Sequence, residues 1–81
     1  MRNVQILLSS VKQVQQFVSS LAPLKGDFEL VCGNYVLDAR SLMGIFGFDL
    51  TKPLNLRVYD ASPENMAGIK PFMIDTEDSK Q

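Results

Sequence analysis

Serine hydroxyls are the main side chains in this 81-residue chain that could carry chemistry. Ser10 precedes Val11-Lys12-Gln13, and Ser41 lies within the segment DARSLMGIFGFDL, residues 38–50. A serine becomes a nucleophile when a base lies beside it, and that base is usually histidine. The chain has no histidine, which excludes Ser-His-Asp and Cys-His catalysis in their usual forms and a histidine-based metal site. The sequence therefore predicts that the protein is not an enzyme and binds neither a metal nor a cofactor.

The composition limits which classes of partner the protein could bind and in which cell compartment it could lie. Cys32 is the only cysteine, so it cannot form an internal disulfide, and we interpret it as a small core residue, with a reactive thiol as the alternative. The net charge of −1 argues against binding to the phosphate backbone of a nucleic acid. The longest uncharged stretch, residues 41–48, is too short to cross a bilayer, and the first residues lack a secretory apolar segment. We expect a cytoplasmic protein with neither a nucleic-acid nor a membrane partner.

The elements that must position these residues begin with a strand and a helix. Apolar residues alternate with others over residues 3–8, which is the period of a half-buried strand. Ser10 and Gln13 then form a capping box, in which the serine accepts from the third helical amide and Gln13 reaches back to the cap. Apolar residues follow at helical spacing as far as Leu21, and Pro23 and Gly26 end the helix.

A β-hairpin is predicted over residues 28–39. Gly33-Asn34 separates two apolar runs, and glycine readily takes the positive φ that a type II′ turn requires at its first position. This turn sets a register with six residues on one face: Cys32 opposite Tyr35, Leu30 opposite Leu37, and Phe28 opposite Ala39. Glu29 and Asp38 lie opposite each other on the other face.

A last strand, residues 54–59, directs Leu54, Leu56 and Val58 inward and Asn55, Arg57 and Tyr59 outward. Ser62-Pro63 starts a third helix, which Gly68 and Pro71 limit to about two turns. The predicted fold is an α+β open-faced sandwich, with an antiparallel sheet of four strands covered on one face by helices. Residues 1–73 form a single domain, and residues 74–81 are expected to be a disordered tail.

The segment after Ser41 has apolar residues on both sides of a short helix. Ser41 occupies the N-cap position, where its oxygen can accept from the amide of Met43 or Gly44. At about 100° per residue, one side gathers Gly44, Ile45 and Phe48, and the other side gathers Leu42, Met43 and Phe46. Only one side can rest on the sheet. The second side, beside Arg40, is either a docking surface for a partner or additional core.

The run DARSLMGIFGFDLTKPLNLRV, residues 38–58, resembles the second half of HPr, the small phosphocarrier of the bacterial sugar phosphotransferase system. The resemblance extends over roughly residues 10–60, and RSLMG is its most specific part. It implies the βαββαβα open-faced sandwich of that family. It also places Ser41 on the regulatory serine that a dedicated kinase phosphorylates in Gram-positive members, and Leu42, Met43 and Phe46 on the apolar patch that contacts partners.

The chain departs from the family at the phosphocarrier site. The alignment puts Ser10 where the phosphorylated histidine belongs, Lys12 where an arginine belongs and Gln13 where a proline belongs. Phosphoserine is a stable ester, so Ser10 cannot replace a histidine that passes its phosphoryl group on. The resemblance therefore implies a member that has lost the carrier role.

Three functions follow from these observations. The first is an HPr-like regulatory or adaptor protein, a monomer or weak dimer, in which Ser41 is a phosphorylation site. Its partner would be a phosphotransferase-system component, HPr kinase or a transcriptional regulator, and its contact residues Lys12, Arg40, Leu42, Met43 and Phe46. The second is a binding domain with the same fold and no phosphorylation role. The third is an enzyme or carrier that uses Ser10 or Ser41, although no base accompanies either hydroxyl.

Overall fold

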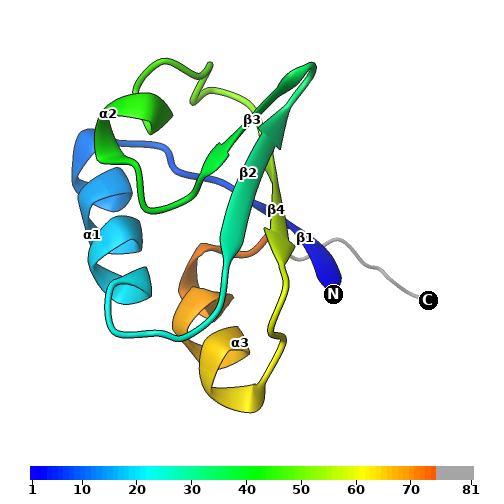
Figure 1. Ribbon diagram of the computed structural model, residues 1–81. Coiled ribbons are helices and arrows are strands. Elements are labelled where there is room, and N and C mark those ends of the chain that lie inside the picture. Colours follow the sequence, from blue (N-terminus) through cyan, green and yellow to red (C-terminus); the bar gives the residue numbers. More distant parts are fainter. Residues whose placement is uncertain (75–81) are drawn as a thin grey trace.

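The computed structural model describes residues 1–74 as an α+β domain, with three helices on one face of a four-stranded antiparallel sheet (Figure 1). This coarse architecture confirms the prediction. The elements follow in the order β1 (Arg2–Ile6), α1 (Val11–Leu21), β2 (Phe28–Cys32), β3 (Tyr35–Asp38), α2 (Leu42–Ile45), β4 (Leu54–Val58) and α3 (Pro63–Ile69), with a 3₁₀ turn, η1, at Lys70–Phe72. Within the described part of the chain, no helix is long and apolar enough to cross a membrane.

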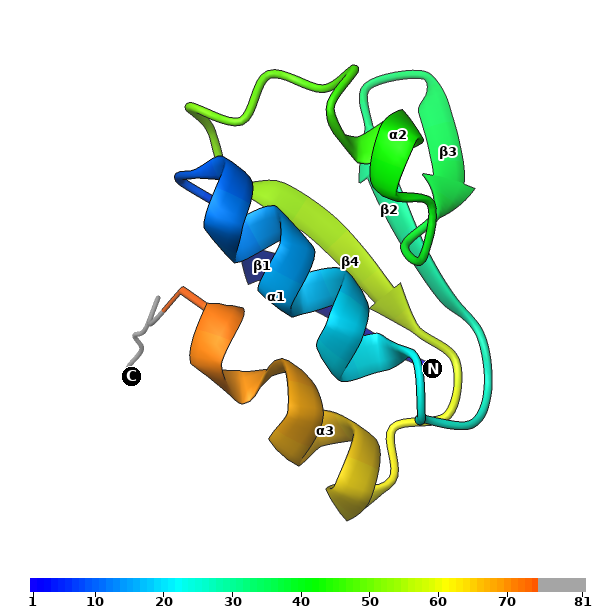
Figure 2. The same ribbon diagram turned by 90° about the vertical axis from the view of Figure 1, so that its left-hand side faces the viewer.

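The strand order in the sheet is β1-β4-β2-β3. Only β2 and β3 are neighbours in both the sequence and the sheet, since β4 inserts between β1 and β2. The helices lie side by side over the inner face, with α1 between α3 and α2 (Figure 2). Among the described residues, no helix lies on the other face of the sheet (Figure 1).

The core lies between the sheet and the helices. From β4, Leu54, Leu56 and Val58 are buried and point inward as predicted, and α1 contributes its apolar stripe. The buried apolar residues are Ile6, Leu8, Val14, Phe17, Leu21, Phe28, Leu30, Ala39, Ile45, Leu54, Leu56, Val58 and Ile69. Cys32 is only partly buried and packs against this core.

The predicted cap of α1 is present in altered form. The Gln13 amide donates to the Ser10 hydroxyl at 3.1 Å, as the capping box requires. The side chain of Gln13 does not return to the Ser10 amide. It accepts from the amide and the hydroxyl of Ser9, at 2.7 and 2.9 Å. The Gln13 side chain therefore bonds to Ser9, one residue before the cap, and fixes the end of the loop between β1 and α1.

The hairpin has the predicted register, with Cys32 opposite Tyr35, Leu30 opposite Leu37 and Glu29 opposite Asp38. Gly33 has φ 59°, and no non-glycine residue in residues 1–74 has positive φ, which fits the type II′ turn and excludes type I′. Tyr35 shares the face of Leu37 as predicted, but its side chain is 73% exposed. Tyr35 follows the turn on the edge strand, where the core ends.

The chain after β4 forms α3 and η1 and then bonds to β1. The Ser62 hydroxyl caps α3 by accepting from the Asn65 amide at 3.2 Å. Helix α3 has about two turns as predicted, with Gly68 as its second-last residue. A Cβ at Gly68 would come within 2.8 Å of Leu24 Cδ1. Ile74, assigned to the tail from the sequence, donates its amide to the Gln5 carbonyl at 3.0 Å. The rest of the predicted tail, residues 75–81, lies outside the described residues.

Candidate docking surface around helix α2

Helix α2 is a single turn held on the domain by one buried side chain. Ile45 is fully buried, and α2 packs against α1. Gly44 lies against β3, because a Cβ at this position would be 3.1 Å from Leu37 Cδ1 and 2.9 Å from Ser41 Oγ. A side chain at position 44 would require the side chains of Ser41 and Leu37 to move. Gly44 and Ile45 therefore fix how the remaining residues of α2 face outward.

Two of the three residues predicted to form an apolar patch are exposed. Met43 is 80% exposed and Phe46 is 38% exposed, whereas Leu42 is half-buried and packs against the core. The predicted side of α2 is thus divided between the core and solvent. We call the exposed residues Ser41, Met43 and Phe46 the α2 surface.

Ser41 occupies the N-cap position with extended backbone, φ −86° and ψ 91°. The predicted hydrogen bond from its side chain to the amide of Met43 or Gly44 is not formed, which corrects that expectation. Helix α2 has only four residues, and the amide of its last residue, Ile45, donates to the Ser41 carbonyl at 3.0 Å. This backbone bond closes the turn without the Ser41 hydroxyl. The Ser41 side chain is exposed, and its hydroxyl makes no hydrogen bond within residues 1–74.

Arg40 faces into the molecule, away from the α2 surface. Its guanidinium donates to the carbonyls of Leu21, Leu24 and Gly26 at 3.2, 2.7 and 3.1 Å. The guanidinium carbon also lies 5.1 Å from the centre of the Phe28 ring, within cation–π range. All the donating nitrogens of the fork are engaged, so Arg40 joins the end of α1 to the start of β2. Its charge is not presented beside Met43.

Ser10 and Lys12 lie at the start of α1. The Ser10 hydroxyl accepts from the Gln13 amide as the cap of α1. Lys12 lines an open groove of about 660 Å³ on the side of α1 that faces η1. The other lining residues are Gln13, Gln15, Gln16, Ser19, Ser20, Pro71 and Phe72. Because α1 lies between α3 and α2 (Figure 2), the structure does not bring Lys12 together with the α2 surface.

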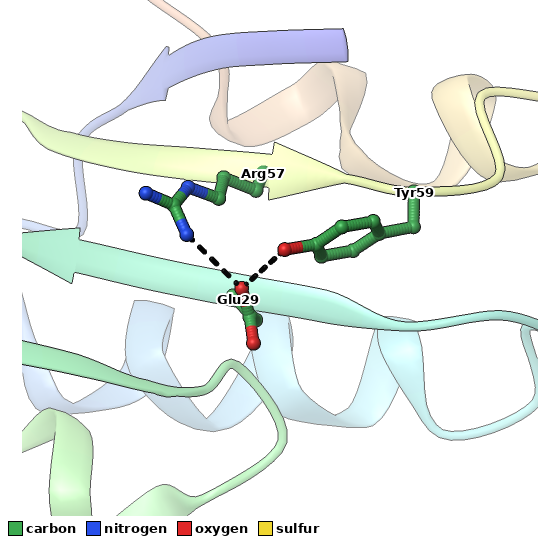
Figure 3. A network of polar contacts seen from close by, with 3 residues as sticks. All are labelled: Glu29, Arg57 and Tyr59. Carbon is green, nitrogen blue, oxygen red and sulfur yellow. Dashed lines mark hydrogen bonds and ion pairs between the residues drawn. The ribbon is translucent and has the colours of Figure 1, made fainter. Parts of the chain in front are cut away.

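A polar network lies on the opposite face of the sheet. Tyr59 donates its hydroxyl to Glu29 Oε1 at 2.6 Å, and Arg57 Nη1 lies 3.4 Å from the same oxygen (Figure 3). The hydrogen bond to Glu29 raises the pKa of Tyr59 above 10.0. The outward direction of all three residues was predicted, but their contact was not, because the sequence did not show that β4 neighbours β2. The opposite charges of Glu29 and Arg57 were the available signal.

No three histidine, cysteine or carboxylate side chains in residues 1–74 gather as metal ligands. Comparisons with family models, with curated proteins and with solved structures gave no match. The strongest functional feature of residues 1–74 is therefore the exposed apolar pair on α2 beside a free serine hydroxyl.

Proposed function

We propose that this protein is an HPr-like regulatory or adaptor domain that docks a protein partner through the α2 surface. The observation that carries the proposal is Met43, a large apolar side chain 80% exposed on a helix that Ile45 holds in place. Isolated exposed apolar residues are ordinary, but Met43 in α2 and Phe46 at its C-cap are both exposed and only three residues apart. Methionine and phenylalanine are both enriched at the centres of protein interfaces.

The partner class comes from the resemblance of residues 38–58 to HPr. We propose a phosphotransferase-system component, HPr kinase or a transcriptional regulator. The carrier role is not part of the proposal, because the chain has no histidine and the Ser10 hydroxyl is engaged in capping α1. The domain would act by occupying a partner rather than by passing on a phosphoryl group.

Phosphorylation of Ser41 would control this docking. The hydroxyl is exposed and unbonded within the described residues, so a kinase would not have to break a cap to reach it. A phosphate adds about two negative charges next to Met43 and Phe46. Arg40 would not neutralise them, since its guanidinium already donates to three carbonyls. Partners that need a dry apolar contact would then be rejected, and partners that present arginines would be favoured.

The docking test is an NMR titration of the labelled protein with HPr kinase and, separately, with the general phosphotransferase enzyme. We expect the amide signals of residues 41–47 to shift, and Met43→Asp to weaken binding at least tenfold. Asn55→Asp is the matched control, since it adds the same charge at an exposed site on β4 that faces the helix-free side of the sheet. Unchanged α2 signals with both proteins would contradict the proposed partners.

The phosphorylation test uses HPr kinase and ATP, with mass spectrometry to locate the modified residue. We expect one phosphate, at Ser41, and none in Ser41→Ala. Ser10→Ala should be modified like the wild type. Binding without any incorporation would favour the second function, a domain of this fold that docks a partner and has no phosphorylation role.

A further inference from the structure

We propose that the free edge of β3 pairs with β3 of a second copy of this chain, antiparallel and with the two Val36 residues opposite each other. This would join two sheets into one continuous sheet across a two-fold axis. The inference does not rest on the proposed function, because β3 and the α2 surface are separate parts of the molecule.

The backbone direction along β3 follows from the bonds of its neighbours. The Ala39 amide donates to the Phe28 carbonyl at 2.9 Å, which shows that Ala39 faces β2. Backbone groups of successive residues in a strand point to opposite sides. Tyr35 and Leu37 therefore bond to β2, while the N–H and C=O of Val36 point to the open edge. Those two groups have no partner within residues 1–74.

The two edges of the sheet differ in their protection. At the β1 edge, the Leu7 amide donates to the Phe72 carbonyl and the Ile74 amide donates to the Gln5 carbonyl, so the chain after η1 covers the C-terminal end of that strand. The β3 edge has no such cover among the described residues. It also lacks the lysine, proline or bulge that usually keeps an edge strand from pairing. Val36 itself is 49% exposed and Tyr35 is 73% exposed.

The sequence of β3 is complementary to itself in the proposed register. With Val36 opposite Val36 of the second copy, the two residues exchange both backbone hydrogen bonds. Tyr35 then faces Leu37 of the second copy on the inner face of the sheet, an aromatic–aliphatic pair. Asp38 faces Asn34 and not another carboxylate, so no like charges oppose each other. The Asp38 carbonyl already accepts from Ser41, which ends the ladder at that residue.

The experiment is sedimentation equilibrium of the whole chain from low micromolar concentration to about 1 mM, a range that covers weak association. We expect the mass to rise from 9.0 kDa toward twice that value. Val36→Lys places two ammonium groups opposite each other at the seam and should keep the protein at 9.0 kDa throughout. Asn55→Lys, which adds the same charge on β4, should associate like the wild type.

Amide exchange identifies the surface that pairs. The Val36 amide should exchange at least tenfold more slowly at high concentration, whereas the Leu37 amide, already bonded to β2, should not change. A wild-type mass of 9.0 kDa at every concentration would overturn the proposal. So would association that Val36→Lys leaves intact, or slowed exchange confined to α2. Circular dichroism of both lysine variants confirms that they are folded.

Discussion

The side chain of Arg40 donates hydrogen bonds to carbonyl groups at and after the end of α1, as a capping serine accepts hydrogen bonds from the amides at the start of a helix. The last carbonyls of a helix have no partner within it. Here the guanidinium donates to the carbonyl of Leu21, which also accepts from the Leu24 amide, and to the carbonyls of Leu24 and Gly26 further along the chain. A planar fork with several donors suits this task better than an ammonium.

We expect Arg40→Ala to lower the free energy of unfolding by about 1–3 kcal/mol, because partly buried carbonyls lose a charged donor. Arg40→Lys should recover only part of the loss. Chemical denaturation measures both. Lys12→Ala, another residue predicted to contact a partner but exposed, should stay within about 0.5 kcal/mol of the wild type. Equal effects at the two positions would contradict the structural role of Arg40.

The hydroxyl of Tyr59 should lose its proton at a higher pH than an ordinary tyrosine, because its pKa is raised. Its protonated hydroxyl donates to Glu29, and ionisation would remove that donor and place an anion beside a carboxylate. Tyrosinate absorbance of Tyr35→Phe reports Tyr59 alone, and its pKa should lie above 10.0. Adding Glu29→Ala should return the pKa toward 10.0. The stabilisation is present below pH 10.0 and is lost as the pH rises through the raised pKa. An unchanged pKa after Glu29→Ala would exclude this contact in solution.

At the scale of the elements, the serines before α1 and α2 occupy the same position with different contacts. Ser10 accepts from the Gln13 amide, whereas Ser41 makes no side-chain bond to α2. Ser10→Ala should therefore reduce the free energy of unfolding by about 1 kcal/mol, and Ser41→Ala should change it by less than about 0.5 kcal/mol. Thermal or urea unfolding distinguishes them. A larger loss at Ser41 would show that α2 depends on its cap.

The elements that could be predicted are those with a strong local signal. The capping serine and the apolar stripe set the bounds of α1, and Gly33-Asn34 set the register of β2 and β3. The place of β4 between β1 and β2 has no local signal, so the contact between Glu29 and Arg57 was not predicted.

The candidate site was predicted only in part for a similar reason. Helical spacing put Leu42, Met43 and Phe46 on one side of a helix, but it could not show how far the core reaches around a single turn. Arg40 was expected to contact a partner because it lies beside the apolar side of the short helix in the sequence. The three carbonyls that bind it come from a segment about 15 residues earlier in the chain, which spacing does not reveal.

At the scale of the whole molecule, one buried side-chain amide connects the loop between α1 and β2 with the loop between β4 and α3. Asn65, 2% exposed, donates to the carbonyls of Lys25 and Asp60 at 2.7 and 2.8 Å. Asn65→Ala leaves both carbonyls without this donor, so we expect a loss of about 1–3 kcal/mol in the free energy of unfolding. Glu64→Ala, on the exposed side of α3, is the control and should be nearly neutral. Similar urea midpoints for both variants would refute this role.

The strand order also decides when the chain can fold. The β2–β3 hairpin closes through a two-residue turn, but the strand that pairs with β1 is β4, and Arg2 lies opposite Val58 in that pair. Closing so long a loop costs more chain entropy than closing a hairpin and slows folding. During synthesis, the first strand leaves the ribosome with no partner until Val58 has followed it. For that interval its backbone is unpaired on both sides, and the earliest part of the sequence becomes the last part of the sheet to be completed.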